Sequence, residues 1–137
     1  MEIRSIKELK NLAGKRVLVR ADFNVPLKGK KIEDDFKIYK SLATIKFLLK
    51  AGAKIILVSH LGRPVGVEKK LSLKPIAAHL QKLLNKNIKY YNIKILNINY
   101  FDNVKENIKN LKNGEVALLD NIRFFAGEEK NDRTLAK

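Results

Sequence analysis

The side chains best suited to chemistry fall in three short segments, each directly after an apolar run. They are Asp22 and Asn24, then Ser59, His60 and Arg63, and finally Asp120, Asn121 and Arg123. Arginine's planar fork matches the oxygens of carboxylates and phosphates, and histidine exchanges a proton near neutral pH. If the three segments meet, these residue types indicate a site for a small ligand that carries several negative charges.

The apolar runs are the elements that must bring these side chains together. Residues 16–20, 55–58 and 116–119 are short and rich in Val, Ile and Leu, which favours strands over helices. A further strand is expected at 88–91 or at 93–98. We expect the first strand to be buried, and the fourth to leave an uncovered sheet edge. Parallel α/β sheets bind ligands beyond the carboxyl ends of their strands, where all three polar segments would lie.

Three helices are expected between the strands. The first follows Asp34 and Asp35, which favour a helix N-cap, and its apolar residues share one face: Ile38, Leu42, Ile45, Leu48 and Leu49. The second begins at Ser72 or Leu73, and the third at Asn103. This alternation predicts an α/β fold, a three-layer, Rossmann-like parallel sheet with helices on both faces. Lys37, in the first turn of the first helix, would face the same edge as the polar segments.

Composition narrows the class of protein. The 137 residues suit one domain, and 29 Lys+Arg against 14 Asp+Glu give a net charge of +15, which suits phosphorylated or polyanionic partners. The absence of cysteine excludes disulfides and cysteine metal sites. His60 and His79 lack acidic neighbours at metal-ligand spacing, so no metal site is expected. No stretch approaches the ~20 apolar residues of a membrane span, and no signal peptide opens the chain, so we expect a soluble, cytoplasmic protein.

Other interpretations of the same residues stay open. Tyr90, Tyr91, Tyr100 and Phe101 lie among lysines and could stack on bases. The chain would then be a non-enzymatic, nucleic-acid-binding module, although packing within the fold is the commoner role of such residues. The polar residues could also serve only turns and surface ion pairs. The functional interpretation depends on separate segments meeting at one edge.

Three motifs resemble the phosphoglycerate kinase family. Residues 16–26 (RVLVRADFNVP) resemble its signature segment, 59–64 (SHLGRP) its second substrate loop, and 120–124 (DNIRF) with 127–129 (GEE) its third. The resemblance runs from about residue 7 to the last residue, with the motifs in the family's order. It implies a longer, two-domain glycolytic kinase that transfers a phosphoryl group reversibly between 1,3-bisphosphoglycerate and ADP, giving 3-phosphoglycerate and ATP.

The resemblance also assigns roles to residues. The implied substrate-binding residues are Asp22, Phe23 and Asn24 around the glycerate, and His60, Leu61, Gly62, Arg63 and Arg123 around its carboxylate and phosphate. Lys37 matches the family's transition-state arginine; it is the implied catalytic residue and is also implied to bind the substrate. Residues 1–137 would then be an incomplete amino-terminal, 3-phosphoglycerate-binding domain. The magnesium complex of ATP or ADP would bind the missing carboxyl-terminal domain of a monomeric enzyme, and no cofactor is expected on this chain.

Two departures from the family pattern affect these expectations. Lys37 replaces an arginine, and an ammonium group neutralises the equatorial oxygens of a transferring phosphoryl group less well than a guanidinium. We therefore expect reduced activity, and an inactive paralogue that binds a phosphorylated metabolite stays an alternative. Phe125 and Ala126 also differ from the third motif. Asn131-Asp132 predicts a helix that stops at Lys137, as if the chain were cut off.

Overall fold

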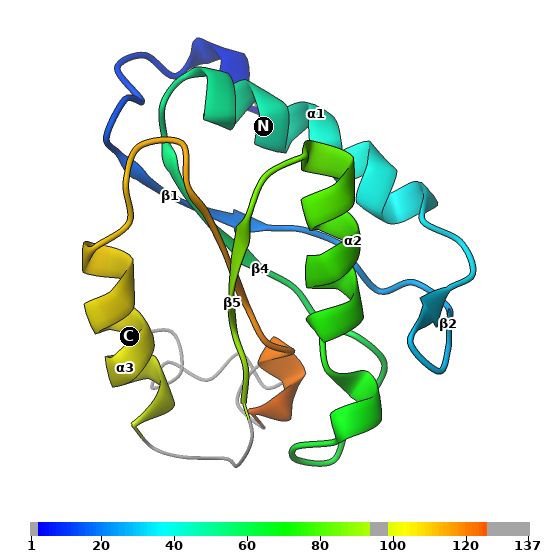
Figure 1. The fold of residues 1–137 in the computed structure, drawn as a ribbon. Helices are drawn as coiled ribbons and strands as arrows, with labels where there is room; N and C mark the ends of the chain where they lie inside the picture. Colours follow the sequence, from blue (N-terminus) through cyan, green and yellow to red (C-terminus); the bar gives the residue numbers. More distant parts are fainter. Residues whose placement is uncertain (1–2, 94–98, 126–137) are drawn as a thin grey trace.

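The computed structural model describes residues 3–93 and 99–125. A parallel sheet has the strand order β1 (Arg16–Arg20), β4 (Lys54–Val58), β6 (Val116–Leu119) and β5 (Ile88–Tyr91), and a small hairpin pairs β2 (Leu27–Lys28) with β3 (Lys31–Ile32). The helices are α1 (Phe36–Lys50), α2 (Lys74–Leu84) and α3 (Tyr100–Lys109), with short 3-10 turns η1 (Ile6–Glu8), η2 (Lys69–Leu71) and η3 (Ile122–Phe124). Figure 1 shows this arrangement.

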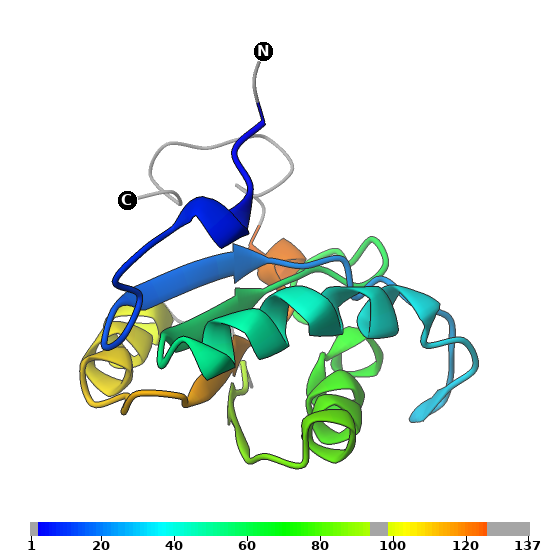
Figure 2. The same cartoon turned by 90° about the horizontal axis from the view of Figure 1, so that it is seen from above.

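The helices cover both faces of the sheet. α1 and α2 lie together on one side of it (Figure 2) and contribute Ile38 and Ile76 to the larger apolar cluster, which also holds Phe23. α3 contributes Val104 to a smaller cluster on the opposite face, against Ala117 of β6. Alternate residues of the central strands therefore point into two separate cores. This confirms the predicted three-layer α/β architecture.

The order of the strands corrects two predictions. β1 is not buried: it is an edge strand whose burial alternates along its length, and Leu18 is 69% exposed. The fourth predicted strand is not at an edge, because β6 inserts between β4 and β5. All four residues of β6 are buried, as expected of a parallel strand with neighbours on both sides and helices on both faces. The edges are β1 and β5.

Helix ends also differ in detail from the predictions. α3 begins at Tyr100, so Asn103 lies inside the helix, where its carbonyl accepts a hydrogen bond from the Asn107 side chain. Before α1 it is the Asp34 side chain that accepts the backbone N–H of Phe36, at 2.9 Å, whereas Asp35 pairs with a histidine of α2.

The strand predicted at 88–91 is confirmed. Residues 94–98 of the alternative strand, Ala126 and the predicted helix at 131–132 lie outside the described residues.

The sheet topology explains why the three polar segments can meet. β1 pairs with β4 and β4 pairs with β6, all in parallel, so their carboxyl ends lie side by side. The segments that begin at residues 21, 59 and 120 therefore leave the sheet at the same edge. Within the described residues, no helix is both long and apolar enough to cross a membrane.

Candidate functional site

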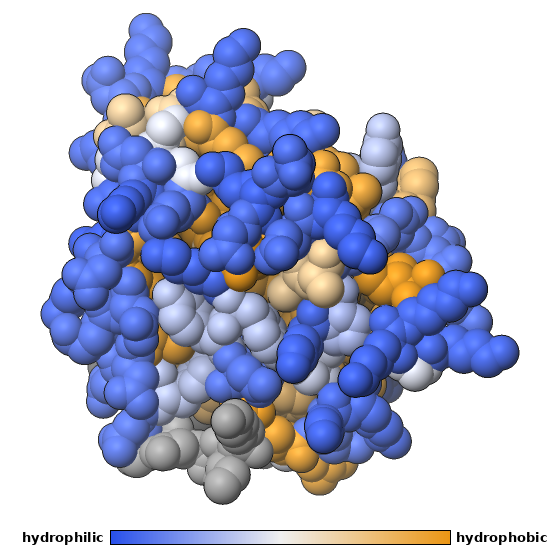
Figure 3. Space-filling model, viewed as in Figure 1, coloured by the Kyte–Doolittle hydropathy of each residue, from blue (hydrophilic) through white to orange (hydrophobic). Residues whose placement is uncertain are grey.

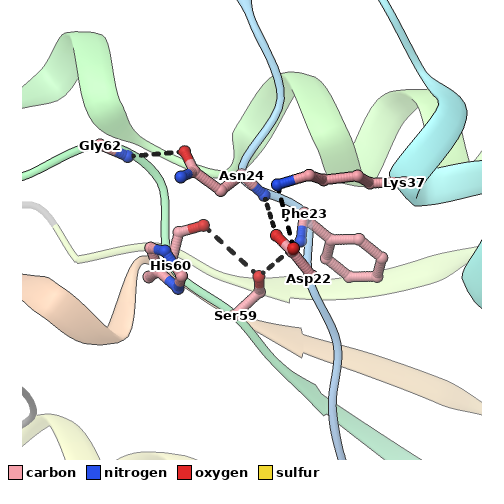
Figure 4. Close-up of polar contacts among 7 residues, drawn as sticks. All are labelled: Asp22, Phe23, Asn24, Lys37, Ser59, His60 and Gly62. Carbon is pink, nitrogen blue, oxygen red and sulfur yellow. Dashed lines mark hydrogen bonds and ion pairs between the residues drawn. The ribbon is translucent and has the colours of Figure 1, made fainter.

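The loop that follows β4 is the centre of the site. On one side it is tied to the loop after β1 by two hydrogen bonds (Figure 4). The backbone N–H of Phe23 donates to Ser59 Oγ at 2.9 Å, and the backbone N–H of Gly62 donates to Asn24 Oδ1 at 3.1 Å. A strand-end loop is thus held in a defined position against its neighbour.

The other side of the same loop is tied to the segment after β6. The Asn121 side chain donates to the carbonyls of Leu61 at 2.7 Å and Leu71 at 2.9 Å, and the backbone N–H of Ile122 donates to the Ser59 carbonyl at 3.1 Å. Arg123 Nη1 lies 3.5 Å from the carbonyl oxygen of Gly62. Three segments that are far apart in the sequence therefore form one hydrogen-bonded unit.

Asp120 is a buried carboxylate within this unit. Its side-chain oxygens accept the backbone N–H groups of Leu73 at 3.0 Å, Asn121 at 2.8 Å and Ile93 at 2.9 Å. The residue is only 1% exposed, so it does not face a ligand. Burial, with the neighbouring Asp120, raises the pKa of Tyr90 well above its usual range. Asp120 positions the loops around it.

Asp22 and Lys37 form the polar surface of the site. Lys37 Nζ lies 3.0 Å from Asp22 Oδ2, and both side chains are about half exposed. Slight burial raises the pKa of Asp22, but the hydrogen bonds from Lys37 and from the Asn24 backbone, with the charges of Lys37 and His60, outweigh it and bring the pKa below its ordinary value. The pair joins the loop after β1 to the first turn of α1. An anion that enters here competes with Asp22 for the ammonium group.

The remaining predicted residues contribute in different ways. Phe23 and Leu61 are 0% and 3% exposed, so their side chains belong to the core and only their backbone belongs to the loops. The half-buried His60 follows Ser59 in the loop after β4, and in Figure 4 its ring lies on the side of Ser59 away from Asp22. Arg63 is exposed, and no hydrogen bond or ion pair with another described residue holds its guanidinium group. The structure therefore brings together the predicted site residues, with one exception. The exposed Arg63 side chain is not held in place by a contact with another described residue.

Ser59, Asp120 and Asn121 are recognisable in the sequence as polar residues after strands, but their role as buried hydrogen-bonding residues between the loops was not predicted. Among the described residues these are the polar or charged ones that are buried. They form the framework under the site. Their position directly after strands of apolar residues could have indicated this role. A polar residue that is buried at such a place must find a hydrogen-bond partner, and it then holds neighbouring loops together.

The aromatic residues proposed as a base-stacking surface are used within the fold. The Tyr90 hydroxyl lies 2.7 Å from Ser72 Oγ, and the Tyr100 hydroxyl donates to the Tyr91 carbonyl at 2.7 Å. The rings of Phe101 and Phe125 pack with their centroids 4.6 Å apart. These contacts favour packing over base stacking for this group.

Comparisons with known proteins agree with the arrangement of the loops. The family model described as phosphoglycerate kinase matches residues 6–137. The phosphoglycerate kinase of Borreliella afzelii is 49% identical over 100% of this chain and 34% of its own length. That of Dictyoglomus turgidum is 52% identical over 93% of this chain and 31% of its own length. The phosphoglycerate kinase structure from Coxiella burnetii matches 98% of this chain and 32% of its own, with a TM-score of 0.79 and 36% identity. The chain spans about a third of the length of these relatives.

Proposed function

We propose, since the chain belongs to the phosphoglycerate kinase family, that it is the 3-phosphoglycerate-binding part of a nucleotide-dependent kinase. In the complete protein, the proposed reaction moves a phosphoryl group between 1,3-bisphosphoglycerate and ADP, giving 3-phosphoglycerate and ATP. Residues 1–137 would form part of the amino-terminal domain. The magnesium nucleotide would bind to the part of the protein outside this chain.

The observation that carries the proposal is the joining of three strand-end loops around residues 59–62, with a cation on either side. Lys37 lies next to Asp22 on one side, and Arg123 contacts the carbonyl of Gly62 on the other. A three-carbon acid phosphate carries a carboxylate at one end and a phosphate at the other, so two separated cationic groups match its charges. The amino terminus of α1, where Lys37 lies, adds the partial positive charge of the helix dipole.

These residues would act by positioning and by charge. In the direction of ATP formation, a terminal oxygen of ADP attacks the acyl phosphate, and the carboxylate of 3-phosphoglycerate leaves with the electrons of the broken P–O bond. Little covalent chemistry is required of the protein, since holding the reactants and neutralising the equatorial oxygens provide most of the catalysis. Lys37 supplies the cation in this chain, and Asp22 holds the ammonium group in place before the substrate arrives.

The test uses the complete protein that contains this chain. Calorimetry with 3-phosphoglycerate measures binding, and ATP formation from 1,3-bisphosphoglycerate and ADP measures turnover. We expect Arg123→Ala to weaken 3-phosphoglycerate binding by at least about tenfold, equivalent to the loss of one charged hydrogen bond. Lys46→Ala is the matched control, because Lys46 is exposed further along α1 and lies outside the site.

The same measurements separate the proposal from the inactive-paralogue alternative. Lys37→Arg restores the fork that binds two oxygens at once, so turnover is expected to rise. Binding of 3-phosphoglycerate with no turnover, even in Lys37→Arg, would establish a metabolite-binding paralogue. No binding of 3-phosphoglycerate to the complete protein would contradict both interpretations.

A further inference from the structure

A second cationic region is a groove of about 1290 Å³ along α2, which borders the candidate site at Phe124 of η3. Its walls come from the β2–β3 hairpin, the segment around η2, the outer side of α2, and residues near the end of β5. The described residues that line it include six lysines: Lys30, Lys31, Lys69, Lys70, Lys74 and Lys82. None of the residues assigned to 3-phosphoglycerate lines this groove. Figure 3 shows the face of α1 and α2 covered largely by hydrophilic side chains, with apolar atoms visible between them.

The positive charge of this lysine groove is concentrated and little neutralised. Of the sixteen described residues that line it, six are lysines and none is Asp or Glu, whereas lysines are 23 of the 137 residues of the chain. Lys70 lies 3.9 Å from Glu68, and His79 pairs with Asp35 at 2.9 Å. The other five lysines make no ion pair with any residue in 3–93 or 99–125. A concave surface lined by charges of one sign focuses its field on an oppositely charged partner.

The spacing of the lysines excludes a single phosphate as the ligand of the whole groove. Lys74 and Lys82 are eight residues apart on one helix, which is about 12 Å at 1.5 Å per residue. Lys30 and Lys69 lie on separate walls. One small anion cannot contact charges on all these elements, whereas a chain of linked phosphates can follow them. Lysine also suits this role, because its ammonium is a point charge with no fixed geometry.

The lining of the groove distinguishes between phosphate chains. Proteins that hold single-stranded nucleic acid without sequence preference combine a basic groove with aromatic side chains on which bases stack. Among the described residues that line it, Phe124 is the aromatic one, and it is 2% exposed. The groove therefore offers charge without a stacking platform. We propose that the lysine groove binds inorganic polyphosphate, a linear phosphate chain that carries no bases.

The test compares two triple variants of the complete protein that have the same net charge. The groove variant is Lys69→Gln, Lys74→Gln and Lys82→Gln, and the control is Lys10→Gln, Lys46→Gln and Lys105→Gln. All six lysines are exposed, so both variants are expected to fold. The probe is medium-chain inorganic polyphosphate, and its dissociation constant is measured at several salt concentrations.

We expect the groove variant to bind polyphosphate at least about tenfold more weakly at low salt. The slope of log K against log salt should become less negative by about 2. Each contact between a lysine and a phosphate contributes about −0.7 to this slope in single strands, and the variant loses three such contacts. The control should bind within about twofold of the unchanged protein. Equal weakening of both variants would overturn the proposal, because it would show diffuse surface charge instead of a site.

Two further measurements complete the test. Single-stranded polyuridylate is compared with polyphosphate at equal phosphate concentration, and tighter binding of the RNA would overturn the choice of a base-free chain. Binding of 3-phosphoglycerate to the groove variant is expected to be unchanged. The proposed kinase function and the polyphosphate site can therefore fail independently of each other.

Discussion

The candidate site and the lysine groove are both cationic, but their charges are held in different ways. At the site, the loops are fixed from below by Ser59, Asp120 and Asn121, the buried polar or charged residues of 3–93 and 99–125. In the groove, the charges are on lysines, among them the exposed Lys69 and Lys82. The four-carbon stem of lysine is flexible and fixes no geometry for its charge.

This difference predicts different ligand selectivity. A framework of buried hydrogen bonds fixes the distances between groups, and it therefore selects a ligand by shape as well as by charge. Flexible surface lysines determine the density of positive charge, but they do not fix the distances between the charges. Substitutions under the site should change stability and affinity together, whereas substitutions in the groove should change only salt-dependent binding.

The largest expected effect is on turnover. Lys37→Ala removes the cation that the proposed function places next to the reacting phosphoryl group. It should lower kcat of the complete protein by roughly 10³, the low end for a charged group of this kind in phosphoryl transfer. Lys69→Ala, in the groove, should leave kcat unchanged. Equal kcat values for the two variants would remove the functional difference between the regions. Steady-state ATP formation provides the measurement.

A buried amide under the site should matter most for stability. Asn121→Ala leaves the carbonyls of Leu61 and Leu71 without their donor, so the free energy of unfolding should fall by about 2–4 kcal/mol. Urea unfolding of this chain measures the change. Asn107→Ala, which removes an exposed amide of α3, is the control and should stay within about 0.5 kcal/mol. A similar loss in both variants would show that burial of the amide is not the cause.

The tie between the first two loops should have an intermediate effect. Asn24→Ala removes the acceptor of the Gly62 backbone N–H and loosens the loop that carries His60. We expect 3-phosphoglycerate to bind about tenfold more weakly to the complete protein, which corresponds to about 1.4 kcal/mol. Calorimetry with Asn92→Ala as the control tests this, because Asn92 is exposed in the groove lining. Unchanged affinity would mean that the loop holds its position without this bond.

The smallest expected effect concerns the surface ion pair. The pKa of Asp22 is lowered in the folded chain, so its carboxylate stabilises the fold above its ordinary pKa of 3.8. That contribution is lost as the pH falls through the lowered value. Because both partners are about half exposed, Asp22→Asn should reduce the free energy of unfolding by less than about 1 kcal/mol at pH 7. Urea unfolding should show the two proteins converging at acid pH, and a difference that grows on acidification would contradict the assignment.

Local patterns in the sequence predicted most of the elements that carry the site. The apolar spacing from Ile38 to Leu48 predicted α1 with its buried face, and the runs at 55–58 and 116–119 predicted two strands that the structure confirms. The position of β6 in the middle of the sheet could not be read from strand order along the chain, because the crossover through α3 returns it between β4 and β5. For the same reason, the exposed Leu18 of β1 was expected to be buried.

The sequence by itself determined which residues could bind an anion, which segments would become strands and helices, and that the polar segments follow strands. Only the tertiary structure decided that Asn121 holds the carbonyls of Leu61 and Leu71, that Asp120 is buried, and that six lysines surround one groove. The reason is physical. Helix and strand patterns arise from contacts between near neighbours in the chain, whereas hydrogen bonds across 50 or 60 residues and the grouping of surface charges depend on how the elements pack.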